Sequence, residues 1–162
     1  MYMLQEDLAW YKKMYLRWYN GNINFGSDDM TDLERAREFF KHDRYATDAT
    51  GIVIDEVSKN YAKCSLKITD VHKNALGHVM GGVAFTLADF VFAIATNFDA
   101  EYPTVTTVSQ ISYLAVPKGD TLYGESRLIK DGKRNCFYEI LITDNLKTDV
   151  AVVNVTGTHI IK

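Results

Sequence analysis

The sequence predicts an α+β protein in which a curved antiparallel sheet of about six strands is wrapped around one long buried helix. Two runs with strand-like alternation precede residue 70, and four more follow residue 100. A single apolar segment, residues 81–97, lies between the two groups. A sheet wrapped around that segment is the compact arrangement that buries it with so few elements.

Helices are predicted before the first strand. Residues 4–19 place apolar or aromatic side chains at intervals of three and four, which describes one face of a helix. Thr31 and Glu34 have the spacing of a capping box that opens a second helix through about His42. We therefore expect an N-terminal helical extension and linker over residues 1–30 and one domain over residues 31–162.

The strands are predicted from period-two alternation and from the turn residues between them. Residues 51–57 and 61–68 form the first pair, and within the second run Cys64 and Leu66 alternate with polar neighbours, as a half-buried strand requires. The later strands are expected near 104–115, 120–130, 135–143 and 149–160, separated by turn-forming residues.

The segment of residues 81–97 is apolar on all sides, which is typical of a buried helix. A membrane span is the competing interpretation. The segment is shorter than the roughly 20 residues that a bilayer requires, and Asp89 lies in its middle, so a span is disfavoured.

Composition and charge disfavour several other classes. The 162 residues carry a net charge of -3, which gives no electrostatic reason to bind nucleic acid or an anionic membrane. The cysteines Cys64 and Cys136 are expected to be reduced thiols, and the N-terminus has acidic residues where a signal peptide has basic ones, so a cytoplasmic location is expected. The four histidines show no metal-ligand spacing, and surface or turn roles are expected for them.

The candidate chemistry lies around the apolar segment. Asp89 is its only ionisable residue, and a carboxylate retained in such a helix indicates a catalytic or binding role, or else a structural hydrogen-bond network. Gly81 and Gly82 precede it by two turns, where uncovered N–H groups at a helix start can hold a phosphate or stabilise an oxyanion. Together these features indicate an acyl-transfer site.

The same residues carry a family resemblance. The pattern Asn74-x-x-Gly77-x-x-Met80-Gly81-Gly82, continued by Leu87-Ala88-Asp89, resembles the phenylacetate-pathway (PaaI-like) branch of hotdog-fold thioesterases. Residues 110–120, 132–134 and 156–159 resemble later parts of that family, so the resemblance covers residues 50–160. It implies a hotdog fold, a homodimer or homotetramer, and hydrolysis of an acyl-CoA to a free acid and coenzyme A without a metal or redox cofactor.

The resemblance also implies roles for particular residues. The Gly81 N–H would polarise the thioester carbonyl, and Asp89 of the other subunit would act as general base or nucleophile. Asn74 would position water or the carbonyl, and Thr106, or Thr107 if the alignment shifts by one residue, would assist the attacking group. Substrate and coenzyme A contacts are implied for Gly82, Met80, His78, Lys133 and Arg134, of which the last two would meet the phosphates.

Met80 departs from the family pattern, which most often has His at this position. Since methionine is only a weak hydrogen-bond acceptor, a non-catalytic acyl-CoA or fatty-acyl binding protein is the alternative function. A hydratase on the same fold needs a histidine in register beside an acid, and Met80 beside Asp89 argues against it. A regulatory or scaffold role through the predicted helix of residues 4–19 is a third class of function. A short or aromatic acyl group fits the branch, and the large side chains Phe85 and Phe92 suggest a modest pocket.

Overall fold

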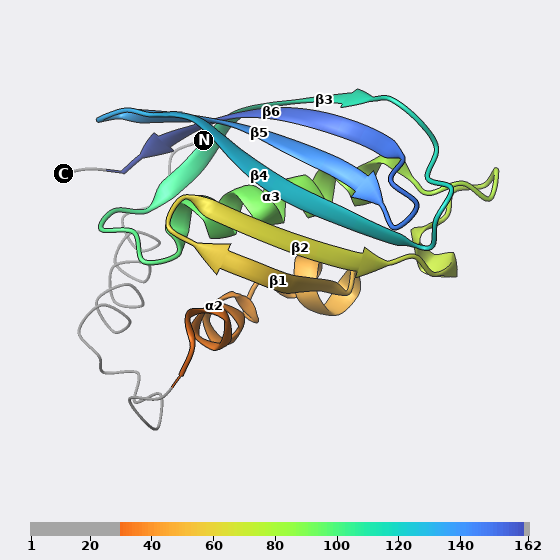
Figure 1. Cartoon of the computed structure of the whole chain (residues 1–162), viewed down its shortest axis with the longest axis horizontal. Coiled ribbons are helices and arrows are strands. Elements are labelled where there is room, and N and C mark those ends of the chain that lie inside the picture. Colours follow the sequence, from red (N-terminus) through yellow and green to blue (C-terminus); the bar gives the residue numbers. More distant parts are fainter. Residues whose placement is uncertain (1–29, 161–162) are drawn as a thin grey trace. The chain divides into compact units, whose positions relative to one another are not determined.

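The computed structural model describes residues 30–160 (Figure 1). The predicted helix of residues 4–19 and the linker after it lie outside the described residues. Contacts divide the chain into Met1–Thr31 and Asp32–Lys162, and the second unit contains every helix and strand that the structure describes. It begins with helix α2 (Asp32–Phe40), which ends two residues earlier than the sequence predicts, and a short π-helical turn at Tyr45–Ala49 follows.

The predicted strands are confirmed, with boundaries shifted by one or two residues. All six belong to one antiparallel sheet with the order β1-β2-β4-β5-β6-β3, so β1 and β3 form its edges. The strands are β1 (Ile52–Ser58), β2 (Tyr61–Lys67), β3 (Thr104–Tyr113), β4 (Thr121–Asp131), β5 (Asn135–Asp144) and β6 (Asp149–His159). This arrangement around one central helix is the predicted hotdog fold.

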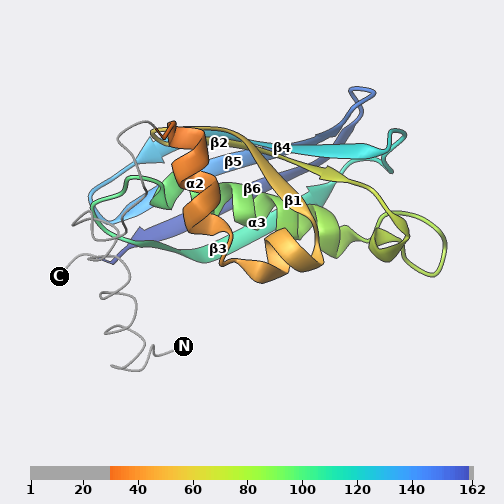
Figure 2. The ribbon, with the colours of Figure 1, turned by 90° about the horizontal axis from the view of Figure 1, so that it is seen from below.

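Helix α3 (Gly81–Asn97) lies against one face of the sheet, and the views in Figure 1 and Figure 2 agree on this placement. The sheet comes so close that a Cβ on Gly157 would lie 2.6 Å from the ring of Phe92. Nine residues of α3 are buried, and they are Ala84, Leu87, Ala88, Phe90, Val91, Phe92, Ile94, Ala95 and Thr96. Among the described residues no helix has the length and apolar character of a membrane span.

Burial of α3 differs from the prediction in one respect. The helix is not covered on all sides, since Gly82 and Asp89 are exposed and Phe85, Thr86 and Ala93 are only partly buried within the subunit. The sheet covers one side of α3, and α2 packs on β1 rather than along the whole of α3 (Figure 2). The apolar composition therefore indicated a helix that the rest of the described chain covers only in part.

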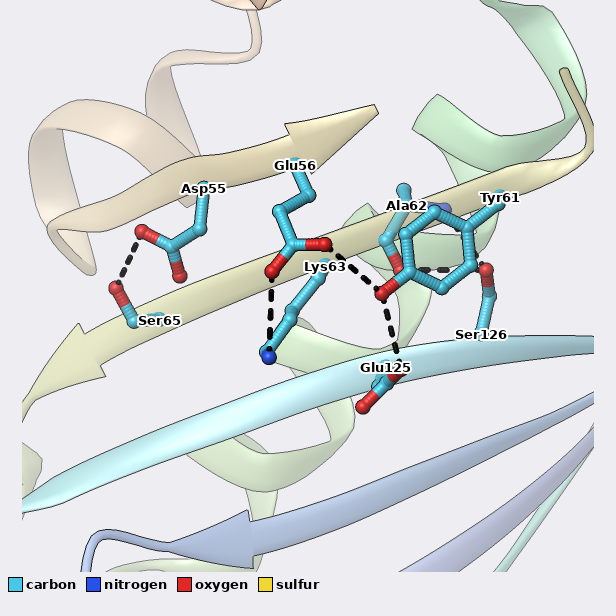
Figure 3. A network of polar contacts seen from close by, with 8 residues as sticks. All are labelled: Asp55, Glu56, Tyr61, Ala62, Lys63, Ser65, Glu125 and Ser126. Carbon is cyan, nitrogen blue, oxygen red and sulfur yellow. Dashed lines mark hydrogen bonds and ion pairs between the residues drawn. The ribbon is translucent and has the colours of Figure 1, made fainter. Parts of the chain in front are cut away.

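The β1–β2–β4 side of the sheet is held by polar contacts (Figure 3). The Ser126 hydroxyl accepts a hydrogen bond from Ala62 N at 2.9 Å and donates one to Ala62 O at 3.2 Å, both buried between β2 and β4. The Tyr61 hydroxyl donates to Glu125 at 2.9 Å, and Asp55 accepts from Ser65 at 3.0 Å. These pairs link neighbouring strands, so they help to fix the register of the sheet.

A β-bulge in β3 decides which of its side chains face α3. Thr106 pairs with Gly157 but Val108 pairs with Thr156, so Thr107 is an extra residue without a partner position on β6. An uninterrupted strand would place Thr106 and Tyr113 on opposite faces because their separation is odd. The bulge brings both to the face that packs toward α3.

Candidate functional site

Asp89 and Thr106 meet between α3 and β3. The Thr106 hydroxyl donates a hydrogen bond to Asp89 Oδ1 at 3.4 Å, whereas the Thr107 hydroxyl donates to Thr156 O at 3.0 Å. Of the two threonines that the sequence offered, Thr106 is therefore the one whose hydroxyl contacts Asp89. The side chain of Asp89 is not enclosed by the helix core, as its place in an apolar segment had suggested, but is exposed within one subunit.

Two effects act on the ionisation of Asp89. Protein atoms that displace water from the carboxylate raise its pKa, and the hydrogen bond from Thr106 lowers it by a smaller amount, so the pKa lies above the ordinary value. A carboxylate with a raised pKa is a better proton acceptor when it is ionised, which suits a general base.

The start of α3 carries backbone donors that the helix itself does not satisfy. Met80 has an extended backbone (φ -67°, ψ 135°) immediately before the helix, and its N–H donates to His72 O at 2.9 Å. The first N–H groups of a helix have no acceptor within it, and the helix dipole is positive there. The Met80 side chain is 55% exposed, so it flanks these donors without burying them.

Tyr113, at the end of β3, lies over the first of these donors. A Cβ placed on Gly81 would lie 2.7 Å from the Tyr113 hydroxyl oxygen, a distance that real Cβ contacts do not show. Glycine is therefore required at position 81 for the tyrosine to lie where it does. Sequence reasoning missed Tyr113, because only the return of β3 along α3 brings it to the helix start.

The loop before α3 is ordered by Asn74 and His72. The Asn74 carboxamide oxygen accepts hydrogen bonds from Leu76 N at 2.9 Å and His78 N at 3.2 Å, so Asn74 shapes the loop that leads to Met80. The His78 side chain is exposed. His72 is buried, with its Nε2 3.0 Å from Thr50 O and its Nδ1 accepting from Thr69 N at 3.0 Å, so it has a structural turn role.

The fold of the single chain does not bring all predicted site residues together. Gly81 and Asp89 are eight residues apart on α3, which is about 12 Å along the helix axis. Lys133 and Arg134 form the β4–β5 turn, at the sheet end where Arg134 O accepts from His159 N. His159 pairs with Thr104, whose N–H donates to the Asn97 side chain at the C-terminal end of α3. The basic turn and Gly81 therefore lie at opposite ends of the helix.

In the described part of the chain, cavities border α3 near Asp89 and near its C-terminal end. The smaller, of about 370 Å³, contains Asp89, and its α3 wall is completed by Thr86, Phe90 and Ala93. Its opposite wall is the segment before β1, which contributes Asp43, Arg44, Tyr45 and Ala46. Neither Phe85 nor Phe92, the side chains from which a modest pocket was predicted, is part of this lining.

The larger cavity, of about 830 Å³, lies near the other end of the helix and includes Lys133, Tyr138 and His159. It does not contain Asp89, so its greater volume does not make it the candidate active site.

The segment of residues 43–46 carries a second carboxylate that the sequence did not single out. Burial raises the pKa of Asp43, the charge of Asp89 raises it further, and neighbouring His42 lowers it. Repulsion between like charges is mutual, so ionisation of either carboxylate disfavours ionisation of the other. The signal in the sequence is weak, because an Asp between two helical segments is most often a solvated turn residue.

Comparison with known proteins adds independent support for a thioesterase fold. Residues 76–151 match the model of the Thioesterase superfamily. The structure is similar to that of the E. coli PaaI protein from the phenylacetic acid degradation operon, with 26% identity and a TM-score of 0.69 over 79% of this chain and 96% of that one.

Two further structures resemble the chain. Streptococcus mutans smu.793, solved bound to acetyl CoA, shares 28% identity with a TM-score of 0.62 over 67% of this chain and 87% of that one. A hypothetical thioesterase protein of Streptococcus pneumoniae, solved with coenzyme A, shares 21% identity and has a TM-score of 0.67, which shows a common fold over 74% of this chain and 95% of that one. The matched segment, the hotdog fold and the similarity to PaaI together show that this chain is similar to the hotdog-fold thioesterases.

Proposed function

We propose that the protein hydrolyses an acyl-CoA thioester to the free acid and coenzyme A. The observation that carries the proposal is Asp89, a carboxylate with a raised pKa that borders a cavity and accepts a hydrogen bond from Thr106. The match of residues 76–151 to the Thioesterase superfamily model supports thioester hydrolysis, and the acetyl CoA bound to the S. mutans relative supports an acyl-CoA substrate.

The reaction requires a base and a donor to the carbonyl oxygen. Asp89 takes a proton from water as the water oxygen attacks the carbonyl carbon, and the Gly81 N–H stabilises the oxyanion that forms. Collapse of this intermediate breaks the carbon–sulfur bond, and the proton passes to the departing thiolate. An alternative first step, attack by the Asp89 carboxylate itself, would form a mixed anhydride that water then hydrolyses.

A site made by two subunits follows from the distance along α3. Gly81 and Asp89 of one chain are about 12 Å apart along the axis and cannot both contact one thioester group. The edge strand β3 offers a surface for a second copy, because no strand of residues 30–160 pairs with its outer side and Val105, Val108 and Tyr113 are exposed on it. We infer a homodimer, or a tetramer built from it, in which Gly81 of one subunit faces Asp89 of the other.

The remaining predicted contacts fit this arrangement. Asn74 orders the loop that carries Met80 to the helix start, so its part in positioning substrate is indirect. Lys133 and Arg134 are exposed at the opposite end of α3 from Gly81 of the same subunit. Contacts from this turn to the coenzyme A phosphates would therefore belong to a site completed by the partner.

Met80 favours a second candidate, an acyl-CoA binding protein without turnover. Its thioether flanks the helix N-terminus where a hydrogen-bonding side chain would assist the carbonyl, and a thioether is a weak acceptor that donates nothing. The two candidates differ in turnover and not in binding.

Thiol release from a panel of acyl-CoAs, compared between the native protein and Asp89→Asn, tests the proposal. Hydrolysis by the native protein that falls about a hundredfold or more in the variant is expected for loss of a general base. Binding of coenzyme A by both proteins without turnover of any substrate would establish the binding function instead. Light scattering of the eluted protein reports the oligomeric state, and a monomer would contradict the two-subunit site.

A further inference from the structure

The cavity beside Asp89 has the location and lining of an acyl-binding pocket. We propose that it holds the acyl group of the substrate and selects uncharged short-chain acyl groups against those that end in a carboxylate. This inference rests on the proposed function and adds a substrate class to it. The cavity has about 370 Å³, at the lower end of the range for small-molecule sites.

The walls of the cavity come from two segments that are far apart in the sequence. Phe90 and Ala93 of α3 face Ala46 of the π-helical turn, and Phe90 and Ala46 are almost fully buried. These three side chains provide an apolar surface for carbon atoms. Because Asp89 belongs to the same lining, a thioester carbon placed near this carboxylate has the cavity beside it.

The acyl group is the part of the substrate that suits this space. Coenzyme A carries three phosphate groups and is too large for a cavity of about 370 Å³. Its phosphates would also approach the carboxylates of Asp43 and Asp89, and like charges repel. The nucleotide must therefore extend away from the cavity. The small uncharged acyl group is the part of the substrate that enters it.

The charges around the cavity provide the selection. Asp43 and Asp89 line it together, and they are close enough for the charge of Asp89 to act on Asp43. Among the lining residues that the structure describes, the one cationic side chain is Arg44, which is 81% exposed and donates a hydrogen bond to Asp48 at 2.9 Å. A terminal carboxylate on the acyl group would enter a region with two acidic side chains and one cation that already has an acidic partner.

Butyryl-CoA and succinyl-CoA provide the test, because both carry four-carbon acyl groups and the latter ends in a carboxylate. We expect kcat/KM of the native protein to be at least about tenfold lower for succinyl-CoA, the scale of one like-charge contact near a protein surface. Asp43→Asn removes one charge without changing the size of the side chain. It should raise kcat/KM for succinyl-CoA several-fold more than it changes kcat/KM for butyryl-CoA.

Asp149→Asn is the matched control, since Asp149 is exposed at the start of β6 and lies outside the lining of this cavity. It removes the same net charge and should leave the ratio of the two substrates unchanged. Equal hydrolysis of both substrates by the native protein, or an equal effect of Asp43→Asn on both, would overturn the proposal that the pocket selects by charge. Neither result would contradict the proposed thioesterase activity. Absence of hydrolysis of any acyl-CoA would instead overturn the proposed function.

Discussion

The phenol ring of Tyr113 lies against Gly81, so that a methyl group on Gly81 would come within 2.7 Å of the hydroxyl oxygen and 2.8 Å of the ring carbon that bears it. The end of β3 and the start of α3 therefore meet at a single residue. Leu114, the next residue, donates its N–H to Val150 O at 2.9 Å, which anchors the strand end beside this contact.

Gly81→Ala tests the importance of that contact. The added methyl group must displace the tyrosine and cover the first backbone donor, so we expect kcat/KM for thioester hydrolysis to fall by about tenfold to a thousandfold, the upper end being the loss of an oxyanion donor. Gly82→Ala is the comparison, because its Cβ meets only the flexible end of Met80 at 3.1 Å. Equal losses in the two variants would contradict a specific role for the Gly81 position.

Thr106→Val tests the hydrogen bond to Asp89. That bond favours the ionised carboxylate, so its removal raises the pKa of Asp89 and moves the acidic limb of the kcat/KM profile to higher pH. Loss of one such bond should also lower kcat/KM about twofold to tenfold. Thr107→Val is the control, since its hydroxyl donates to Thr156 O. A profile that does not move in Thr106→Val would exclude Asp89 as the group that titrates.

Asp144 has a structural role that pH can reveal. It is buried at the end of β5, where its carboxylate accepts hydrogen bonds from Lys118 N, Gly119 N, Leu146 N and Thr148 N at 2.7–2.9 Å. Burial alone would raise the pKa of Asp144, but the hydrogen bonds from Thr148, Gly119 and Lys118 outweigh it and hold the pKa well below its usual range. The ionised carboxylate thus ties two surface turns to the sheet.

Asp144→Asn should lower the free energy of unfolding by on the order of 3 kcal/mol at neutral pH, because two backbone donors lose their acceptor. A folded-state pKa below the unfolded one contributes stability above about pH 4, and that stability is lost as pH falls through the folded-state value. The free energy of unfolding, measured with urea, should therefore differ less between the native protein and the variant at about pH 3 than at neutral pH. A difference that widens in acid would refute this account.

Ser126→Ala tests the buried link between β2 and β4. Both backbone groups of Ala62 lose their partner, so the free energy of unfolding should fall by about 1–3 kcal/mol. Ser65→Ala removes a partly buried hydroxyl that donates to Asp55 and should cost less. Thermal unfolding of both variants measures the two effects, and an equal cost would show that burial of the Ser126 pair is unimportant.

Local pattern was sufficient for the elements of this protein. Alternation in residues 61–67 is confirmed by buried Cys64 and Leu66 in β2, and the apolar segment of residues 81–97 is helix α3 with the predicted bounds. Periodicity succeeds here because each element must direct its apolar side chains to one core. Asp89 and Gly81 were recognisable because they interrupt this apolar pattern. An apolar helix ordinarily excludes a carboxylate and disfavours a glycine.

Only the tertiary structure decided which residues meet. Thr106 reaches Asp89, and Tyr113 reaches Gly81, because one extra residue in β3 reverses its alternation, and a bulge of this kind has no reliable sequence signal. Asp43 enters the cavity beside Asp89 because the segment before β1 packs on α3, a contact between residues more than forty positions apart. Such contacts depend on the path of the whole chain, whereas the periodic patterns that predict helices and strands extend over only a few residues.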